Sequence, residues 1–157
     1  MDGEAGAKAL NAGRMNSTGD LDMSDPAIAA AWAACVGSAA GEHAFIALGY
    51  ESKKKLTLIG AGTTGGFASL RPLLADDAVI YGAFKLSAGG TPKLCFVASI
   101  GENAGGMVKG RATAHTQIVE NALEGTTISI QLAESDECEP AAVAAKLSKT
   151  LKVEVTL

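Results

Sequence analysis

Three glycines in the first half of the chain have the spacing of a phosphate-binding loop. Gly60, Gly62 and Gly65 fit the pattern Gly-x-Gly-x-x-Gly, which follows a strand and opens a helix in dinucleotide-binding folds. There the glycines let the backbone approach the pyrophosphate closely. In this chain the preceding strand is expected to be the second arm of a hairpin, not the first strand of a βαβ unit. Binding of a nucleotide or metabolite through the loop from Gly60 to Gly66 is therefore kept as the second of two hypotheses for the function.

The other reactive side chains do not form an evident catalytic or metal-binding set. The two histidines, His43 and His115, have no sequence neighbours that suggest a metal site. The three cysteines, Cys35, Cys95 and Cys138, form no CxxC pair, and the first two lie in apolar runs where a reduced thiol behaves as a small hydrophobe. A Cys–His nucleophilic pair stays open, because it depends on geometry. We expect a cytosolic protein without enzymatic activity, cofactor or metal.

Composition limits the classes of partner. The 157 residues suffice for one domain with a two-layer core. The net charge of -4 argues against general binding to nucleic acid or to an anionic membrane, which requires a basic surface. No apolar run approaches the roughly 20 residues that span a bilayer, and the N-terminus lacks the apolar segment of a signal peptide. A soluble, intracellular protein is expected.

Several cations flank one apolar strand. Residues 94–100 form a run of strand length that follows Lys93. A segment interrupted by glycines comes next and carries Lys109 and Arg111, and a helical pattern begins near Thr113. This order predicts a buried strand that leads into an exposed basic loop at the start of a helix. A further run of three lysines, residues 53–55, lies at an expected turn and is interpreted as a solvated tip.

Capping residues and periodicity predict the elements that position these side chains. Ser24-Asp25-Pro26 has the form of a helix start, and Pro72 is expected to kink or split the helix in which it lies. The order α-β-β-α-β-β-α-β-α indicates an α/β protein of the α+β type, a mixed sheet with helices on its faces. The expected elements are a helix at 26–36, strands at 44–50 and 56–61, a helix at 66–76, strands at 78–86 and 93–100, a helix at 113–123, a strand at 126–132, a helix at 140–151, and a short strand or frayed tail at 152–157.

Two further expectations concern the ends of the domain and the face of one helix. Residues 1–23 show no apolar period and are expected to form a flexible extension, with residues 24–157 as the folded domain. The helix at 113–123 is expected to bury its apolar residues Ile118, Val119 and Ala122. Its polar residues, His115 among them, are expected to point outward.

The segment Phe96-Val-Ala-Ser-Ile-Gly-Glu-Asn103, followed by Gly106-Met-Val-Lys-Gly-Arg111 and a helix, resembles the coactosin subfamily of the actin-depolymerising-factor (ADF) homology superfamily. The shared features are an apolar strand that ends in Ser-Ile-Gly-Glu-Asn, two basic residues at i and i+2, and then a long helix. Asp25-Pro-Ala-Ile and Asp76-Asp77-Ala-Val-Ile-Tyr match more loosely. The order of elements fits the family from about residue 25 to residue 151.

The resemblance implies a single ADF-homology domain with a central mixed sheet of five, or six, strands flanked by about four helices. It implies a non-catalytic protein that binds the side of actin filaments and modulates cytoskeletal dynamics. Such a protein would be monomeric, cytoplasmic and cytoskeleton-associated, with no nucleic-acid or membrane partner.

The resemblance also assigns candidate actin-binding residues. Lys93 stands where the family carries a lysine needed for filament binding, and Lys109 and Arg111 match the basic pair ahead of the long helix. His115, Thr116 and Val119 would lie on the outward or flanking surface of that helix. Two or three cations on one such edge would steer binding to an acidic protein such as actin. Arg111 can fork a carboxylate, whereas Lys109 acts as a point charge.

One departure from the family concerns the charge of the long helix. It carries no lysine or arginine between Thr113 and Leu123, where relatives often have several. The tail helix is basic instead, and its Lys146 and Lys149 join the candidate actin-binding residues. These features predict weak, salt-sensitive binding to filaments and little affinity for monomeric actin.

Overall fold

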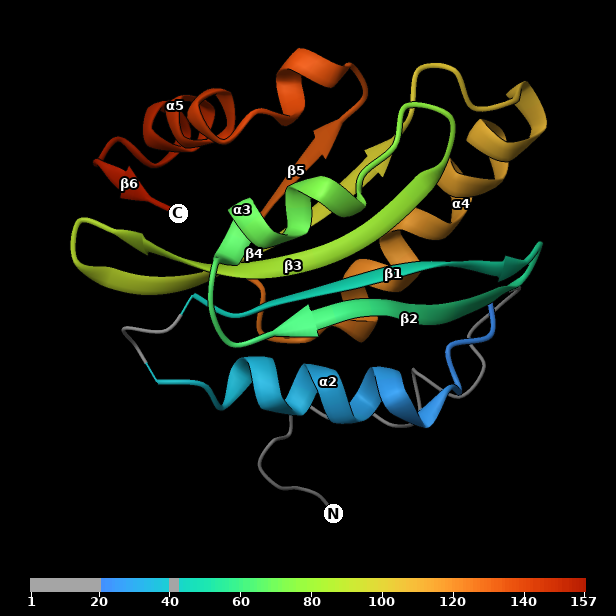
Figure 1. The fold of residues 1–157 in the computed structure, drawn as a ribbon, viewed down its shortest axis with the longest axis horizontal. Helices are drawn as coiled ribbons and strands as arrows, with labels where there is room; N and C mark the ends of the chain where they lie inside the picture. The colour runs from blue at the N-terminus through green and yellow to red at the C-terminus, as the bar shows by residue number, and fades with distance from the viewer. Residues whose placement is uncertain (1–20, 40–42) are drawn as a thin grey trace.

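The fold is known from a computed structural model that describes residues 21–39 and 43–157 (Figure 1). The predicted order of helices and strands is confirmed. The elements are α2 (Pro26–Val36), β1 (Phe45–Ser52), β2 (Lys55–Gly62), α3 (Gly66–Leu70), β3 (Val79–Ala88), β4 (Thr91–Ile100), α4 (Gly106–Ala122), β5 (Ile128–Leu132), α5 (Pro140–Leu151) and β6 (Val155–Thr156), with short 3-10 turns η1 (Arg71–Leu73) and η2 (Ser135–Cys138).

One mixed sheet runs through the centre of the domain. Its strand order is β2-β1-β3-β4-β5, and the short β6 pairs with the end of β3. All pairs are antiparallel except β4 with β5, which α4 connects as a crossover. The expected sheet of five or six strands is therefore confirmed, and residues 155–156 supply the sixth.

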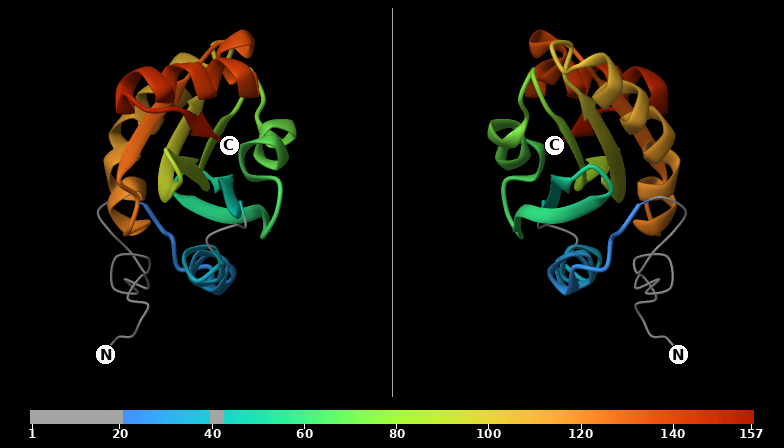
Figure 2. Two further views of the ribbon diagram at one scale, coloured as in Figure 1. Left: turned by 90° about the vertical axis from the view of Figure 1, so that its left-hand side faces the viewer. Right: turned by 90° about the vertical axis from the view of Figure 1, so that its right-hand side faces the viewer.

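Helices cover both faces of the sheet and divide the core in two. Helices α2 and α4 pack on one face, and α3 and α5 pack on the other (Figures 1 and 2). The alternation of a strand explains this division, because successive side chains point to opposite faces. In β3, Tyr81 and Ala83 lie in the cluster under α2 and α4, whereas Ile80 and Phe84 lie in the cluster under α3 and α5.

The folded domain begins earlier than predicted. Leu21 and Met23, placed in the flexible extension, are each only 1% exposed, and Asp22 between them forms a bridge with Lys55 of β2. Only three residues make this contact, which is too short for an apolar period to show in the sequence. Residues 1–20, the rest of the predicted extension, lie outside the described residues.

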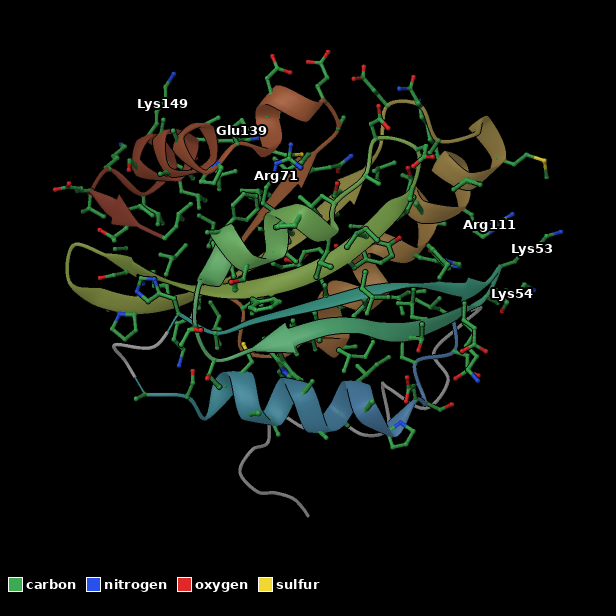
Figure 3. All side chains as sticks on the ribbon, in the orientation of Figure 1. Lys53, Lys54, Arg71, Arg111, Glu139 and Lys149 are labelled. Atoms are coloured by element: carbon green, nitrogen blue, oxygen red, sulfur yellow. The ribbon has the colours of Figure 1, made fainter. Side chains whose placement is uncertain are left out.

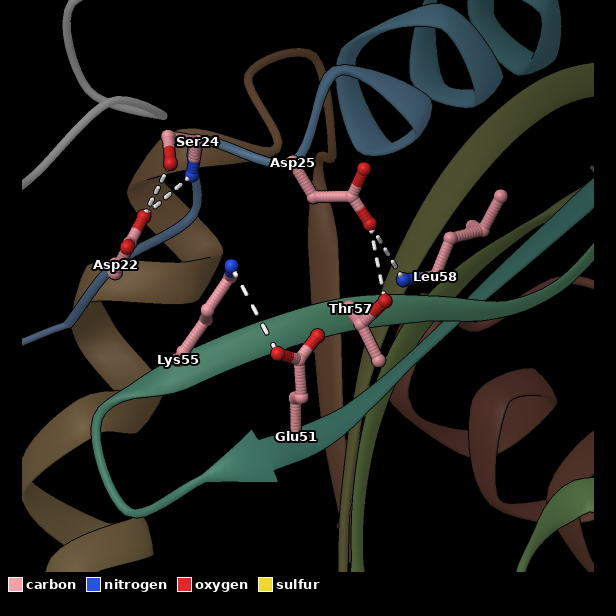
Figure 4. A network of polar contacts seen from close by, with 7 residues as sticks. All are labelled: Asp22, Ser24, Asp25, Glu51, Lys55, Thr57 and Leu58. Carbon is pink, nitrogen blue, oxygen red and sulfur yellow. Dashed lines mark hydrogen bonds and ion pairs between the residues drawn. The ribbon is translucent and has the colours of Figure 1, made fainter.

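Polar contacts then fasten the start of α2 to the β1–β2 hairpin (Figure 4). One carboxylate oxygen of Asp25 accepts the N–H of Ala27 at 3.0 Å and caps α2, as predicted. The other accepts the hydroxyl of Thr57 in β2 at 3.0 Å. These hydrogen bonds, that from Ala27 above all, lower the pKa of Asp25. Asp22 accepts hydrogen bonds from Ser24, which lower the pKa of Asp22 in the same way.

Helix α4 starts at Gly106, seven residues before the predicted start. The expected basic loop is therefore wrong, and Lys109 and Arg111 lie in the first turns of the helix. Glycine costs about 1 kcal/mol in a helix relative to alanine, which is why Gly106 and Gly110 indicated a loop. Packing outweighs that cost here, because Val108 and Ala112 pack against the core. By contrast, the predicted break at Pro72 is confirmed, since α3 gives way to the turn η1 there.

Candidate functional site

The predicted cations do not form one cluster. Lys93 lies near the start of β4, whereas Lys109 and Arg111 follow the end of that strand. Residues 93 to 100 of an extended strand span about 23 Å. Helix α4 then runs back along β4, so that its far end meets the start of the strand, where the Thr127 N–H donates to Leu94 O at 2.9 Å. Lys93 therefore lies at the opposite end of α4 from the pair.

Among these cations, Lys109 is engaged within the fold and Arg111 is available to a partner. The ammonium of Lys109 donates to the carbonyl of Glu102 at 2.6 Å and so holds the loop in front of α4. Arg111 is partly buried, and its guanidinium has no ion pair with any residue in the described ranges. Its charge acts on Tyr50 nearby, where it opposes the rise that burial causes in the pKa of that phenol.

His115 and Val119 are buried, which corrects the outward or flanking position that the resemblance implied for both; the burial of Val119 confirms what the apolar period of the helix predicted. His115 is 4% exposed and Val119 fully buried, whereas Thr116 is partly exposed and donates to the Ala112 carbonyl at 2.7 Å. The buried residues of α4 are Ala112, His115, Val119 and Ala122, which share one face. Because histidine is polar, an exposed position was predicted for His115. A hydrogen bond to Tyr50 beneath the helix compensates for its burial.

His115 is bonded to Tyr50, and Tyr50 is bonded in turn to Tyr81, so that the three side chains form a chain of hydrogen bonds under α4. The Tyr81 hydroxyl donates to the Ala112 carbonyl at 2.9 Å, so its single hydrogen is used. Tyr81 must then accept from the Tyr50 hydroxyl at 3.1 Å, and Tyr50 must accept from His115 Nδ1 at 2.7 Å. Nδ1 of His115 therefore carries a hydrogen. The chain joins β1 and β3 to the first half of α4.

Removal of the middle hydroxyl tests this chain. In Tyr50→Phe the buried Nδ1–H of His115 and the Tyr81 oxygen both lose a partner, and we expect the free energy of unfolding to fall by about 1–3 kcal/mol. The measurement is urea unfolding at neutral pH. Thr150→Val, which removes an exposed hydroxyl of α5, is the control and should change stability by less than about 0.5 kcal/mol. Equal stability of Tyr50→Phe and the unsubstituted protein would contradict the hydrogen-bond assignment.

The cations of the tail helix form a separate group. Lys146 and Lys149 are exposed on α5, and Lys149 points away from the domain at the end opposite Arg111 (Figure 3). Lys85, by contrast, is only 6% exposed, and its ammonium donates to the carbonyl and hydroxyl of Ser38 at 2.8 and 2.7 Å. Lys85 thus fastens the end of α2 to β3 and is not available to a partner.

Two stretches that the sequence singled out separately are in contact. The N–H of Asn103 donates to the Asp76 carbonyl at 2.7 Å, and its side-chain amide donates to the Asp76 carboxylate at 3.1 Å. Gly101 lies against the backbone of Asp76 so closely that a Cβ there would overlap the Asp76 carbonyl. The Ile-Gly-Glu-Asn and Asp-Asp segments therefore form one joint, which fixes the chain just before α4.

The β1–β2 hairpin places Lys53 and Lys54 at the same end of the domain as Arg111 (Figure 3). Sequence reasoning interpreted these lysines as a solvated tip and did not include them in the site. The run of like charges was the available signal. The sequence alone did not show that the tip of this hairpin lies at the same end of the domain as the start of α4.

The glycine pattern at residues 60–65 has a structural explanation. Gly60 and Gly62 lie inside β2, where a Cβ would come within 2.6 Å of the Leu73 side chain and within 2.8 Å of the Phe45 ring. Gly65 precedes α3 with φ 88°, a conformation that favours glycine. Two of the three glycines are thus strand residues and not part of a loop, and α3 has only five residues. The context that a dinucleotide loop requires is not present.

The described residues contain no accessible thiol and no cluster suited to a metal ion. All three cysteines are buried, and burial raises the pKa of Cys35 to about 11 and that of Cys95 to about 12. His115 Nδ1 is bonded to Tyr50 and not to a thiol. Within residues 21–39 and 43–157, no three His, Cys, Asp or Glu side chains gather as ligands, and no helix has the length and hydropathy to cross a bilayer.

Comparison with known proteins identifies related folds. The sequence profile of the family described as cofilin/tropomyosin-type actin-binding protein matches residues 20–148. Human coactosin-like protein is similar in structure with a TM-score of 0.65 and 14% identity over 76% of this chain and 92% of that chain. Coactosin from Entamoeba histolytica has a TM-score of 0.60 and 19% identity over 74% of this chain and 95% of that chain.

The cofilin homology domain of a yeast actin-binding protein has a TM-score of 0.62 and 18% identity over 73% of this chain and 86% of that chain. At such identities the solved structures establish the likeness of fold. A search of curated protein sequences found no match.

Proposed function

This chain belongs to the family of cofilin/tropomyosin-type actin-binding proteins, and from that membership we propose that it binds the side of actin filaments. It consists of a single ADF-homology domain, and the match to the family over residues 20–148 is the observation that carries the proposal. The protein acts by binding, without catalysis, and as a monomer. It works in the cytoplasm in association with the cytoskeleton.

The proposed contacts lie in three separate places. One is the start of α4, where Arg111 has no ion pair with another described residue, and another is α5, where Lys146 and Lys149 are exposed. Lys93 is a third, partly buried contact near the far end of α4. A filament repeats the same acidic surface, so two separated basic regions can be engaged together and gain affinity from multivalency. His115 and Val119 support α4 from below and do not contact actin.

The charge of α4 supports weak, salt-sensitive binding and little affinity for monomeric actin. The exposed positions of α4 after Arg111 are Thr113, Ala114, Gln117 and Asn121, all uncharged. Without cations beyond Arg111, most of the length of α4 offers little attraction to a single acidic subunit. Salt also weakens the attraction between exposed charges, which is largely screened beyond about 8–10 Å at physiological ionic strength.

Co-sedimentation with polymerised actin at several salt concentrations tests the proposal. We expect the chain to pellet with filaments at low salt and progressively less as salt is raised. Arg111→Ala and the pair Lys146→Ala/Lys149→Ala should each weaken binding by a factor of about five, equivalent to about 1 kcal/mol. Lys93→Ala should also weaken it.

Charge-preserving variants serve as the controls. Lys146→Arg/Lys149→Arg should pellet like the unsubstituted chain, whereas Arg111→Lys should bind between Arg111→Ala and that chain, because lysine cannot fork a carboxylate. Thermal unfolding should show that all variants remain folded. The proposal fails if the unsubstituted chain stays in the supernatant even at low salt, and the site assignment fails if it pellets and none of the alanine variants weakens binding.

A further inference from the structure

Three cations gather at one end of the domain although they come from two distant segments. Lys53 and Lys54 form the exposed turn between β1 and β2, and Arg111 lies in the second turn of α4 (Figure 3). We call these three residues the basic pole. None of their side chains has an ion pair or hydrogen bond with another residue in the described part of the chain.

Direct contacts fix the two segments of the basic pole relative to each other. Tyr50, three residues before Lys53, is bonded to Nδ1 of His115, which lies one helical turn after Arg111. Arg111, Lys53 and Lys54 lie at the same end of the domain (Figure 3), and the charge of Arg111 opposes the rise that burial causes in the pKa of Tyr50. Figure 1 draws the tip of the hairpin at the same end of the domain as the start of α4. The three cations are thus held on a preformed surface.

Among the described residues, the acids near the hairpin do not neutralise the basic pole. Glu51 lies 3.8 Å from the ammonium of Lys55, and Asp22 is occupied by hydrogen bonds from Ser24. Both acids thus have partners other than the three cations. A local excess of positive charge therefore stands on a chain whose net charge is -4. Such an asymmetry steers an acidic partner toward this end of the molecule.

The fold itself does not require lysines at the turn. Lys53 and Lys54 have negative φ, since Lys152 is the one non-glycine residue with positive φ in the described ranges. Two adjacent exposed ammonium groups repel each other, so they do not stabilise the turn either. Contact with a partner therefore explains these two lysines better than a contribution to the stability of the fold.

We propose that the basic pole is part of the interface with the actin filament, so that the tip of the β1–β2 hairpin contacts an acidic patch of the filament together with Arg111. This inference rests on the proposed function and adds the hairpin to the interface. A folded protein is a better partner than an anionic membrane for two reasons. Three cations contribute only about 1 kcal/mol each at a lipid surface. The forked guanidinium of Arg111 suits a fixed carboxylate, and the rigid pole suits a fixed pattern of acids.

Charge reversal at the hairpin tip tests the inference. We expect Lys53→Glu/Lys54→Glu to weaken co-sedimentation with filaments at low salt by about tenfold or more and to reduce the salt dependence of binding. Lys53→Gln/Lys54→Gln should have an intermediate effect. Lys53→Arg/Lys54→Arg, which keeps the charge, should bind like the unsubstituted chain. Because the tip is exposed, all three variants should unfold at nearly the same temperature as that chain.

The outcomes separate this inference from the proposed function. If the unsubstituted chain pellets and the reversal variant pellets equally well, the inference is overturned and the proposed function stands. If the unsubstituted chain does not pellet, both are overturned. A parallel assay uses vesicles of phosphatidylcholine with 30% phosphatidylserine, roughly the charge of a cytoplasmic leaflet. Loss of vesicle binding in the reversal variant, with filament binding unchanged, would overturn the inference in favour of a lipid partner.

Discussion

Gly101→Ala is expected to lower the free energy of unfolding by about 3–5 kcal/mol. A Cβ at this position would overlap the Asp76 carbonyl, which is backbone and cannot turn aside as a side chain would. Overpacking of this kind costs about 1–3 kcal/mol. The displacement would also disturb two hydrogen bonds from Asn103 to Asp76, each contributing about 0.5–1.5 kcal/mol. For a domain of this size, the melting temperature should fall by roughly 10 °C.

A matched glycine in the same region provides the control. Gly110 lies inside α4, and a Cβ there would meet no other atom within 4 Å. Gly110→Ala should therefore stabilise the helix by about 0.5–1 kcal/mol and raise the melting temperature. Both variants are compared by thermal unfolding and by urea unfolding. A Gly101→Ala variant as stable as the unsubstituted protein would show that Asp76 and Gly101 do not pack as described.

Trp32→Ala should have an effect of similar size, about 3–5 kcal/mol, by a different mechanism. Trp32 is fully buried in the cluster that joins α2 and α4 to the sheet. Its removal leaves a cavity that the surrounding side chains fill only in part. In addition, its indole N–H donates to the Glu124 carbonyl just after α4 at 3.2 Å, so the substitution also frees the far end of the proposed actin-binding helix.

A second substitution at the same position separates the two contributions. Trp32→Phe keeps most of the buried apolar surface but loses the hydrogen bond to Glu124, so it should cost about 1–2 kcal/mol. Urea unfolding of the two variants gives both values. If Trp32→Ala cost less than Trp32→Phe, the cavity would not be the main cause of the lost stability.

Local signals in the sequence predicted most of the fold. Asp25 with Pro26 marked the start of α2 and Pro72 marked a break, because caps and prolines act on the backbone within a few residues of their own position. The turn expected at residues 53–55 was an equally local signal. The order of elements followed from these signals.

Features that depend on packing at a distance could not be predicted in the same way. The glycines at 106 and 110 indicated a loop, but Val108 and Ala112 pack on the core and make the segment helical. His115 was placed outside because its partner Tyr50, which is bonded in turn to Tyr81, is far away in sequence.

The grouping of the candidate site residues also depends on packing at a distance. Lys93 and Arg111 are close in sequence, but the strand between them carries them to opposite ends of α4. Lys53 and Arg111 are far apart in sequence, but the fold carries them to one end (Figure 3). The individual residues of the site could be named from the sequence, whereas their grouping required the structure.

The joint between Asp76 and the segment 101–103 bears on how freely the surface of this domain can evolve. Its contacts are mostly backbone to backbone: the Asn103 N–H with the Asp76 carbonyl, the Gly101 N–H with the Ala78 carbonyl at 3.0 Å, and the close approach at Gly101. A joint made mostly of backbone contacts restricts the type of residue at few positions other than Gly101. The start of α4 can therefore keep its position while mutation adds or removes the charges displayed on it. The charges that a partner recognises can thus change in evolution without a change in the fold.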